Sequence, residues 1–269
     1  MAEQRVAVVT GVSSGIGRAT ASELQARDYR VFGTVRAPAA ELPEGVERVV
    51  VDVRDEASIT AGVSEVLEKA GRIDVLVNNA GTSILGAIEE TETEQARALF
   101  DVNFFGAVRM TQAVLPAMRA QRSGRIIFVS SVVGFLPAPF MGFYAASKHA
   151  LEGYAESLDH EVRGLGVRAL LVEPGYMKTR LDVNSSQATR SIQDYAAARE
   201  RVSAGINAGV SSGGDPALVA RAIAEAAVAP RPRLRYPVGK GAGTLARLRN
   251  WLPAALFDRG FRKEFHLDS

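Results

Sequence analysis

A tyrosine and a lysine stand four residues apart in the stretch GFYAASKHALEG, at Tyr144 and Lys148. The alanines and the leucine around them favour a helix, and no proline interrupts the stretch. Residues four apart share one face of a helix, so a phenol and an ammonium group would be neighbours. Such a pair could exchange a proton with a substrate oxygen, because a nearby ammonium group stabilises the phenolate and lowers the pKa of the phenol. A solvated surface pair is the alternative.

The elements that must position this pair alternate between strand and helix along the chain. Seven short apolar segments are predicted as strands: 5–10, 29–36, 46–53, 73–81, 124–131, 167–175 and 233–238. They are mostly continuous apolar runs, typical of parallel strands that are buried on both faces. The chain is therefore predicted to be an α/β protein with a doubly wound, Rossmann-type parallel sheet of about seven strands and helices on both faces.

Several helices have recognisable ends. The helix after the third strand should begin near Asp55 and end before Gly71, and a later helix should have Asp215 as its N-cap and Pro216 as its first residue. Two long helices are predicted at 96–121 and 143–164, with small and apolar faces that could pack against a second copy. We predict one catalytic and dinucleotide-binding domain at 1–240, followed by an extension at 241–269. Within the domain, residues 181–214 are rich in Ser, Asn, Gln and Gly and are predicted to form a mobile lid with a short helix.

Composition narrows the class of protein. The 269 residues are 47% hydrophobic and 23% charged, as in a globular protein with a sizeable core. Cysteine is absent, which excludes disulfides, thiolate metal sites and a thiol nucleophile, and no metal site is predicted. The first residues enter a strand without the regions of a signal peptide, and no apolar run is long enough to span a membrane, so a cytoplasmic protein is expected.

The charge is unevenly distributed. The net charge is +2, but residues 230–269 hold nine Lys or Arg against three acids, a balance of +6 that leaves −4 for the first 229 residues. We interpret the C-terminal segment as a helical extension docked on the body, because its apolar spacing fits a docking face. Peripheral contact with a membrane surface is the alternative. Nucleic acid is not an expected partner, because the body is acidic and no reading module is visible.

A glycine-rich turn, TGVSSGIG, follows the first predicted strand and contains Thr10, Gly11, Gly15 and Gly17. Glycines allow a tight turn and close approach to a pyrophosphate, and the following helix offers free N–H groups to the phosphates. A plain strand-to-helix turn is the alternative, but its place after the first strand of an α/β chain predicts dinucleotide binding.

The second and third strands indicate which dinucleotide binds. The second strand ends Thr34-Val35-Arg36, without the acid that would bind a free ribose 2′-hydroxyl. Arg36 could pair with a 2′-phosphate and Ser13 could add a hydroxyl, so NADP(H) is predicted over NAD. Asp52, after the third strand, could accept from the adenine amino group or could simply be an acid at a helix start.

In order and spacing, the motifs resemble those of the short-chain dehydrogenase/reductase family, over roughly residues 5 to 240. The residues that carry the resemblance are Thr10-Gly11-x-x-x-Gly15-x-Gly17, Asn78-Asn79-Ala80-Gly81, Asn103, Ser131, Tyr144-x-x-x-Lys148 and Pro174-Gly175. The segment VFGTVR, the lid and the basic extension are also similar to the branch that holds retinol and hydroxysteroid dehydrogenases. The resemblance implies a homodimer or homotetramer.

The resemblance also implies roles for the site residues. Tyr144 would be the general acid and base, Lys148 would tune it and hold the nicotinamide ribose, and Ser131 would bind the substrate oxygen. Asn103 would hold a water in a proton relay, and Thr179 would bind the carboxamide. The predicted cofactor-binding residues are Thr10, Gly11, Ser13, Ser14, Gly15, Ile16, Gly17, Arg36, Asp52, Val53, Asn79, Ala80, Gly81, Tyr144, Lys148, Pro174, Gly175, Met177 and Thr179.

The substrate is predicted to be an apolar ketone, aldehyde or alcohol. Apolar side chains flank the catalytic residues, and such a lining suits a hydrophobic molecule; they are Phe135, Leu136, Phe140, Met141, Phe143, Tyr176 and Met177. A non-catalytic, NADP-sensing binding protein on the same fold is the competing hypothesis. It predicts a broken tyrosine, lysine or serine, and all three are present.

Overall fold

A central sheet of seven parallel strands, in the order β3-β2-β1-β4-β6-β7-β9, organises the computed structural model, which describes residues 4–179 and 186–264. The strands are β1 Val6–Thr10, β2 Arg30–Val35, β3 Glu47–Val50, β4 Val75–Asn78, β6 Gly124–Val129, β7 Val167–Pro174 and β9 Arg235–Val238. Strand order reverses between β1 and β4, which is where ligands bind in doubly wound sheets. The predicted fold class is confirmed.

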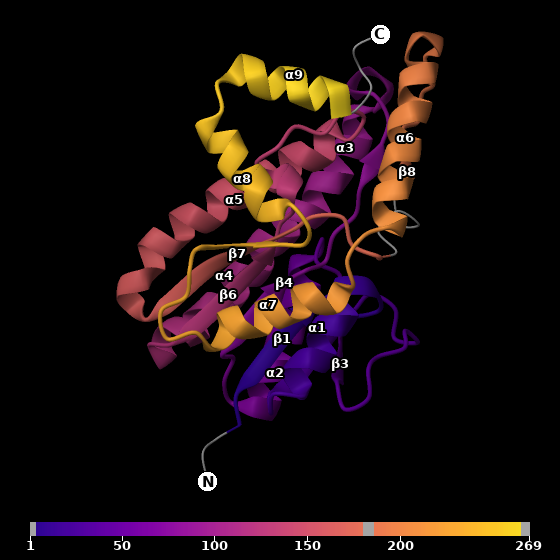
Figure 1. Cartoon of the computed structure of the whole chain (residues 1–269). Helices are drawn as coiled ribbons and strands as arrows, with labels where there is room; N and C mark the ends of the chain where they lie inside the picture. The colour runs from indigo at the N-terminus through magenta and orange to yellow at the C-terminus, as the bar shows by residue number, and fades with distance from the viewer. Residues whose placement is uncertain (1–3, 180–185, 265–269) are drawn as a thin grey trace.

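Helices cover both faces of the sheet (Figure 1). One face carries α1 Gly15–Gln25 and α7 Pro216–Val228, and the other carries α2 Glu56–Ala70, α4 Gly106–Gln121 and α5 Gly142–Val162. Each strand feeds both layers, because successive side chains point to opposite faces. In β1, Ala7 and Val9 pack under α1 and α7, while Val6 and Val8 pack under the opposite layer. This explains why the strands are continuous apolar runs.

The predicted helix ends are confirmed. Asp55 caps α2 and Asp215 caps α7, and each carboxylate accepts from the backbone N–H two residues on, at 2.9 and 2.8 Å. Pro216 is the first residue of α7, and Gly71 ends α2 in the left-handed conformation, at φ 72°. These local signals depend on neighbouring residues alone, which is why the sequence predicted them.

The predicted long helix at 96–121 is wrong in its middle. It is divided into α3 Thr93–Phe100, a turn of π-helix at Asp101–Phe105, and α4. The buried Asn103 side chain lies in this turn, where it is hydrogen-bonded to the backbone of Thr82 and to the Ser147 hydroxyl. Such π-turns often occur at functional sites.

The region predicted as a lid contains a longer helix than expected. Helix α6, Ala196–Ser211, has 16 residues. Earlier in this region, Ser186–Gln187 forms the short strand β8, which pairs with β5, Ile84–Leu85. Residues 181–185 of the predicted lid lie outside the described residues.

Two further helices lie above the carboxyl ends of the strands: α8 Ala242–Trp251 and α9 Ala254–Glu264 (Figure 1). Helix α8 is held to the body at both ends. Ala242 is buried near β9, and Arg249 donates to the carbonyl oxygen of Phe135 at 3.3 Å. Over the residues that the structure describes, no helix combines the length and apolar character needed to cross a bilayer.

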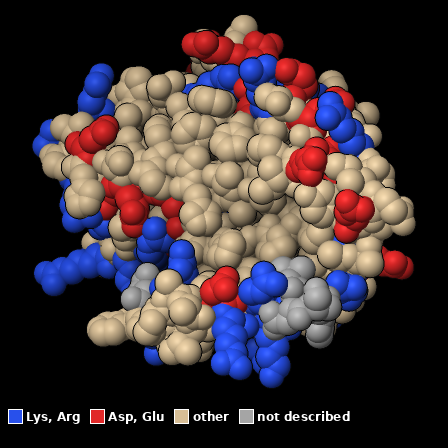
Figure 2. Space-filling view, turned by 90° about the horizontal axis from the view of Figure 1, so that it is seen from above, with Lys and Arg blue, Asp and Glu red and all other residues tan. Residues whose placement is uncertain are grey.

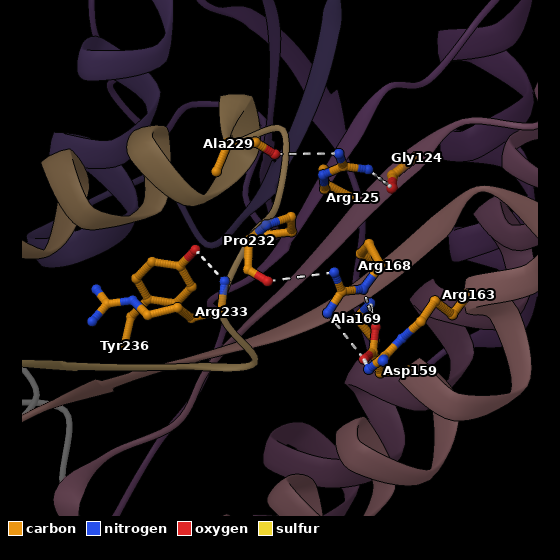
Figure 3. Close-up of polar contacts among 10 residues, drawn as sticks. All are labelled: Gly124, Arg125, Asp159, Arg163, Arg168, Ala169, Ala229, Pro232, Arg233 and Tyr236. Carbon is orange, nitrogen blue, oxygen red and sulfur yellow. Dashed lines mark hydrogen bonds and ion pairs between the residues drawn. The ribbon is translucent and has the colours of Figure 1, made fainter.

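A buried acid joins α5 to the neighbouring strand β7 (Figure 3). The fully buried Asp159 accepts from Arg168 at 2.7 Å, from the Ala169 N–H at 3.1 Å, and from Arg163. Burial alone would raise the pKa of Asp159, but the two guanidinium groups and the amide hold it below the usual range. The resulting stabilisation is complete above about pH 4 and is lost as the pH falls through the folded-state pKa.

Asp159→Asn should lower the free energy of unfolding by about 3 kcal/mol, because it leaves Arg168 partly buried without its counter-ion. Arg163→Ala is the matched control. The Arg163 side chain is 51% exposed, so water screens its ion pair and the loss should be about 1 kcal/mol or less. Urea denaturation at pH 7 measures both, and equal losses would show that Asp159 is not the centre of this cluster.

Candidate active site

A large cavity opens at the carboxyl end of the sheet. Its volume is about 1550 Å³, and its walls come from the loops after β1, β2, β3, β4, β6 and β7 and from α6, α8 and α9. Pockets for one small ligand usually have roughly 300–1000 Å³, so this cavity has room for a dinucleotide and a second molecule. Figure 2 looks onto this end and shows a hollowed centre without charged groups.

One end of the cavity fits a pyrophosphate. Gly11 and Gly15 have φ of 72° and 56°, which glycine adopts without strain. A Cβ at Gly17 would collide with the Gly11 carbonyl oxygen and with the Asn79 side chain, so only glycine lets α1 start this close to the loop. Ser14, at the N-cap of α1, makes no side-chain capping bond, and it lines the cavity together with Ile16. The positive end of α1 therefore faces the part of the cavity that is predicted to hold the phosphates.

A second turn, after β4, is held against the glycine-rich turn. The Thr10 hydroxyl accepts from the backbone N–H groups of Asn79 and Ala80, both at 2.9 Å. The Asn79 amide donates to the carbonyl oxygens of Thr10 at 2.8 Å and Gly11 at 3.2 Å. Asn79 therefore ties the turn after β4 to the turn after β1. Asn78 instead donates to Thr111 on α4, at 3.1 Å.

The predicted adenosine end contains Ser13, Arg36, Asp52 and Val53, all of which line the cavity. The Asp52 carboxylate pairs with Arg54 at 2.6 Å. This hydrogen bond is the main reason why the pKa of Asp52 falls to about 2, and the charge of Arg36 lowers it further. Two cations and one carboxylate thus lie at this end, an electrostatic balance that favours an anion.

The predicted catalytic group comes together at the cavity's centre. Tyr144 and Lys148 lie one turn apart on α5, and the Lys148 Nζ is 5.8 Å from the centroid of the Tyr144 ring. Ser131 lies two residues beyond β6, where its hydroxyl donates to the Pro174 carbonyl oxygen at 3.4 Å and interacts with Tyr144 strongly enough to lower the pKa of the phenol. Lys148 Nζ donates to the Val129 carbonyl oxygen at 2.8 Å. The three side chains therefore meet although they come from two elements.

The predicted direction of the tyrosine pKa is wrong for the protein alone. Tyr144 is 7% exposed, and burial raises its pKa to about 12; the hydrogen bond with Ser131 opposes this only in part. Lys148 is 5% exposed, and burial lowers its pKa to about 8, although the negative charge of Glu152 raises this pKa in part. Removing both groups from water outweighs the attraction that the spacing suggested.

Three predicted site residues lie behind the cavity wall. Thr10 and Gly17 shape the two turns described above, and Asn103 fixes Thr82 beside the cavity. The other predicted site residues line the cavity; they are Gly11, Ser13, Ser14, Gly15, Ile16, Arg36, Asp52, Val53, Asn79, Ala80, Gly81, Ser131, Tyr144, Lys148, Pro174, Gly175, Met177 and Thr179.

Sequence reasoning missed a buried ionic group beneath the catalytic residues. Glu152 is one turn beyond Lys148 on α5; it accepts from the Ser130 hydroxyl at 2.7 Å and pairs with Arg235 of β9 at 2.6 Å. Arg235 also pairs with Glu173, whose pKa is raised to about 7 by burial and by the charge of Glu152. These contacts hold β6, β7 and β9 against α5, but their partners are far apart in the chain.

The apolar end is built differently from the prediction. Leu136, Met141, Tyr176 and Met177 line the cavity as expected, but the three predicted phenylalanines do not. Helices α8 and α9 and the turn between them supply apolar groups in their place: Leu245, Leu248, Leu252, Leu256, Phe257 and Phe261. The spacing of these residues indicated a docking face, but not what it would cover.

The chain belongs to the short-chain dehydrogenase family, whose model matches residues 5–190. It is 36% identical to a 3-ketodihydrosphingosine reductase of Bacteroides thetaiotaomicron, over 97% of both chains. A short-chain dehydrogenase from Streptomyces avermitilis has a TM-score of 0.83 and 35% identity, and the match covers 97% of this chain and 99% of the other.

A family member from Burkholderia phymatum was solved in complex with NAD. It has a TM-score of 0.78 and 28% identity, over 93% of this chain and 95% of the other. These comparisons make the protein an oxidoreductase of this family, with a nicotinamide cofactor.

Gly17→Ala should weaken dinucleotide binding at least tenfold, because the new Cβ forces the glycine-rich turn away from α1. Gly153→Ala is the matched control on α5: nothing lies within 4 Å of its Cβ, and alanine should stabilise the helix by about 0.5–1 kcal/mol. Fluorescence titration with NADPH and thermal unfolding measure the two effects. Unchanged binding in Gly17→Ala would exclude this turn as the phosphate site.

Proposed function

We propose that the protein is an NADP(H)-dependent oxidoreductase that interconverts an apolar ketone or aldehyde and the corresponding alcohol. The observation that supports this most is the meeting of Tyr144, Ser131 and Lys148 in one cavity beside a turn that fits a pyrophosphate. A binding protein without catalysis would not need a buried phenol and amine at this point.

Tyr144 is the proton donor in reduction. Burial keeps its phenol protonated at neutral pH, so it can protonate an alkoxide as that charge develops. Ser131 donates to the same substrate oxygen and stabilises its charge. Lys148 is mostly charged at pH 7, since its pKa is about 8, and it stabilises the phenolate left after proton transfer. In oxidation the same groups act in reverse.

The nicotinamide cofactor, held by the two turns and by Pro174, Gly175 and Thr179, would supply or accept the hydride. The loops after β4 and β7 line the cavity together with Tyr144, so they would determine on which side of Tyr144 the nicotinamide ring can lie. Asn103 acts on this region indirectly, because it accepts from the Thr82 N–H at 2.8 Å and donates to the Thr82 carbonyl oxygen at 2.9 Å. We propose it as a positioning residue.

NADP(H) is the proposed cofactor because of charge at the end of β2. Arg36 lines the cavity there, beside Ser13, and Asp52 is already paired with Arg54. A free carboxylate aimed at the ribose would repel a 2′-phosphate, whereas a guanidinium group binds one strongly. This local charge supports NADP(H), although the Burkholderia phymatum relative was solved with NAD.

The proposed substrate is an apolar carbonyl compound with a long hydrocarbon part. Leucines and phenylalanines of α8 and α9 extend the cavity well beyond the catalytic residues. The Bacteroides thetaiotaomicron relative is named as a reductase of a 3-keto compound, 3-ketodihydrosphingosine, and this name agrees with reduction of a ketone.

Tyr144→Phe should lower kcat for ketone reduction roughly 10²–10⁴-fold, because it removes the proton donor and keeps the ring. Binding of NADPH should change less than about twofold. Turnover of a hydrophobic ketone, followed by NADPH absorbance, and a fluorescence titration measure the two. Wild-type turnover in Tyr144→Phe would overturn the mechanism.

Arg36→Ala should lower kcat/KM for NADPH at least roughly tenfold, since a hydrogen bond to a charged group contributes about 1.5–3 kcal/mol. The value for NADH should stay within about twofold, because NADH has no 2′-phosphate. Arg18→Ala, at a partly buried position near the start of α1 that does not line the cavity, is a control for loss of one positive charge. An equal loss with both cofactors would contradict a 2′-phosphate site.

A further inference from the structure

The two C-terminal helices expose large apolar side chains to solvent. Trp251, at the end of α8, is 85% exposed, and Leu256, in the first turn of α9, is 59% exposed. Leu252 lies between them and is 37% exposed. Neighbouring exposed apolar groups of this size usually mark an interaction site.

The same helices are strongly basic. Between 242 and 264 the chain has five cations and two acids, and the cations are Arg247, Arg249, Arg259, Arg262 and Lys263. Figure 2 shows Lys and Arg side chains projecting along the edge of the molecule where α8 and α9 lie in Figure 1. The surface is therefore apolar and cationic together.

The exposed apolar surface is continuous with the inside of the cavity. Leu248, Leu252 and Leu256 line the cavity and are also accessible to solvent. Apolar groups that solvent can reach thus line the same cavity as Tyr144. The guanidinium carbon of Arg249 on α8 lies 5.1 Å from the centroid of the Phe257 ring on α9, and this contact connects the two helices.

We propose that α8 and α9 form a docking surface for an anionic lipid bilayer, through which a long-chain substrate enters the cavity. The surface would sit at the headgroup level, with Trp251, Leu252 and Leu256 in the acyl boundary and Arg259 and Lys263 on the phosphates. The entry of substrate rests on the proposed function, whereas docking itself does not.

Charge and shape favour a bilayer over other partners. Helices that lie in a membrane interface typically combine tryptophan and leucine side chains with flanking cations, as α8 and α9 do. Nucleic acid would use the cations but would leave the leucines in water. A second copy of the chain would bring the same positive charges against each other.

The test is sedimentation of the full chain with vesicles made of equal parts phosphatidylglycerol and phosphatidylcholine. We expect binding to these vesicles, weaker binding at high salt, and little binding to pure phosphatidylcholine. Trp251 is the only tryptophan of the chain, so its emission should shift to shorter wavelength on binding. Absence of binding, or an unshifted emission in the bound protein, overturns the proposal.

Variants distinguish docking from folding and from catalysis. Arg259→Glu/Lys263→Glu should bind the anionic vesicles at least tenfold more weakly, and Trp251→Ser should also weaken binding. Both should keep the circular dichroism spectrum and the turnover of a small water-soluble ketone. Arg221→Glu/Arg231→Glu, at exposed positions on α7 and in the loop after it, is the charge-matched control and should bind as the wild type does. Equal loss in both double variants overturns the proposal.

Two further results would also overturn it. One is binding of duplex DNA or RNA in preference to the vesicles. The other is a concentration-dependent dimer that Trp251→Ser abolishes. Tyr144→Phe should bind vesicles as the wild type does, so a wrong catalytic assignment would leave the docking result intact.

Discussion

The removal of Tyr144 and Lys148 from water is the constraint on which the rest of the site depends. In water, a phenol and an amine four residues apart on a helix would have nearly equal pKa values. Burial separates them, to about 12 for Tyr144 and about 8 for Lys148. The phenol thus keeps its proton until a substrate oxygen needs it, and the amine holds a charge that a small change in pH removes.

The surrounding structure offsets part of the cost of burying these two groups by hydrogen bonds and by a nearby negative charge. Lys148 donates to the Val129 carbonyl oxygen, and Glu152, one turn further on α5, raises the lysine's pKa against the effect of burial. Glu152 is itself held by Ser130 and Arg235. Polar groups from β6, β9 and α5 itself therefore support these two side chains, and their geometry is preorganised before any substrate binds.

Much of this architecture could be predicted from local signals. The apolar runs predict the parallel sheet, Asp55 and Asp215 predict helix starts, and Gly11 and Gly15 predict a turn of positive φ. The π-turn around Asn103 could not be predicted, because it depends on Thr82 and Ser147. The raised pKa of Tyr144 and the role of α8 as a cavity wall also follow from packing between distant segments, which spacing does not encode.

The pH dependence of kcat for ketone reduction tests the central claim most directly. Lys148 loses its positive charge as the pH rises through its pKa, so kcat of the wild type should fall around pH 8. The arginine of Lys148→Arg stays charged well above pH 8, so kcat of this variant should not fall around pH 8. Its maximum rate can be lower than that of the wild type without affecting this test. Identical alkaline limbs in the two proteins would contradict the account.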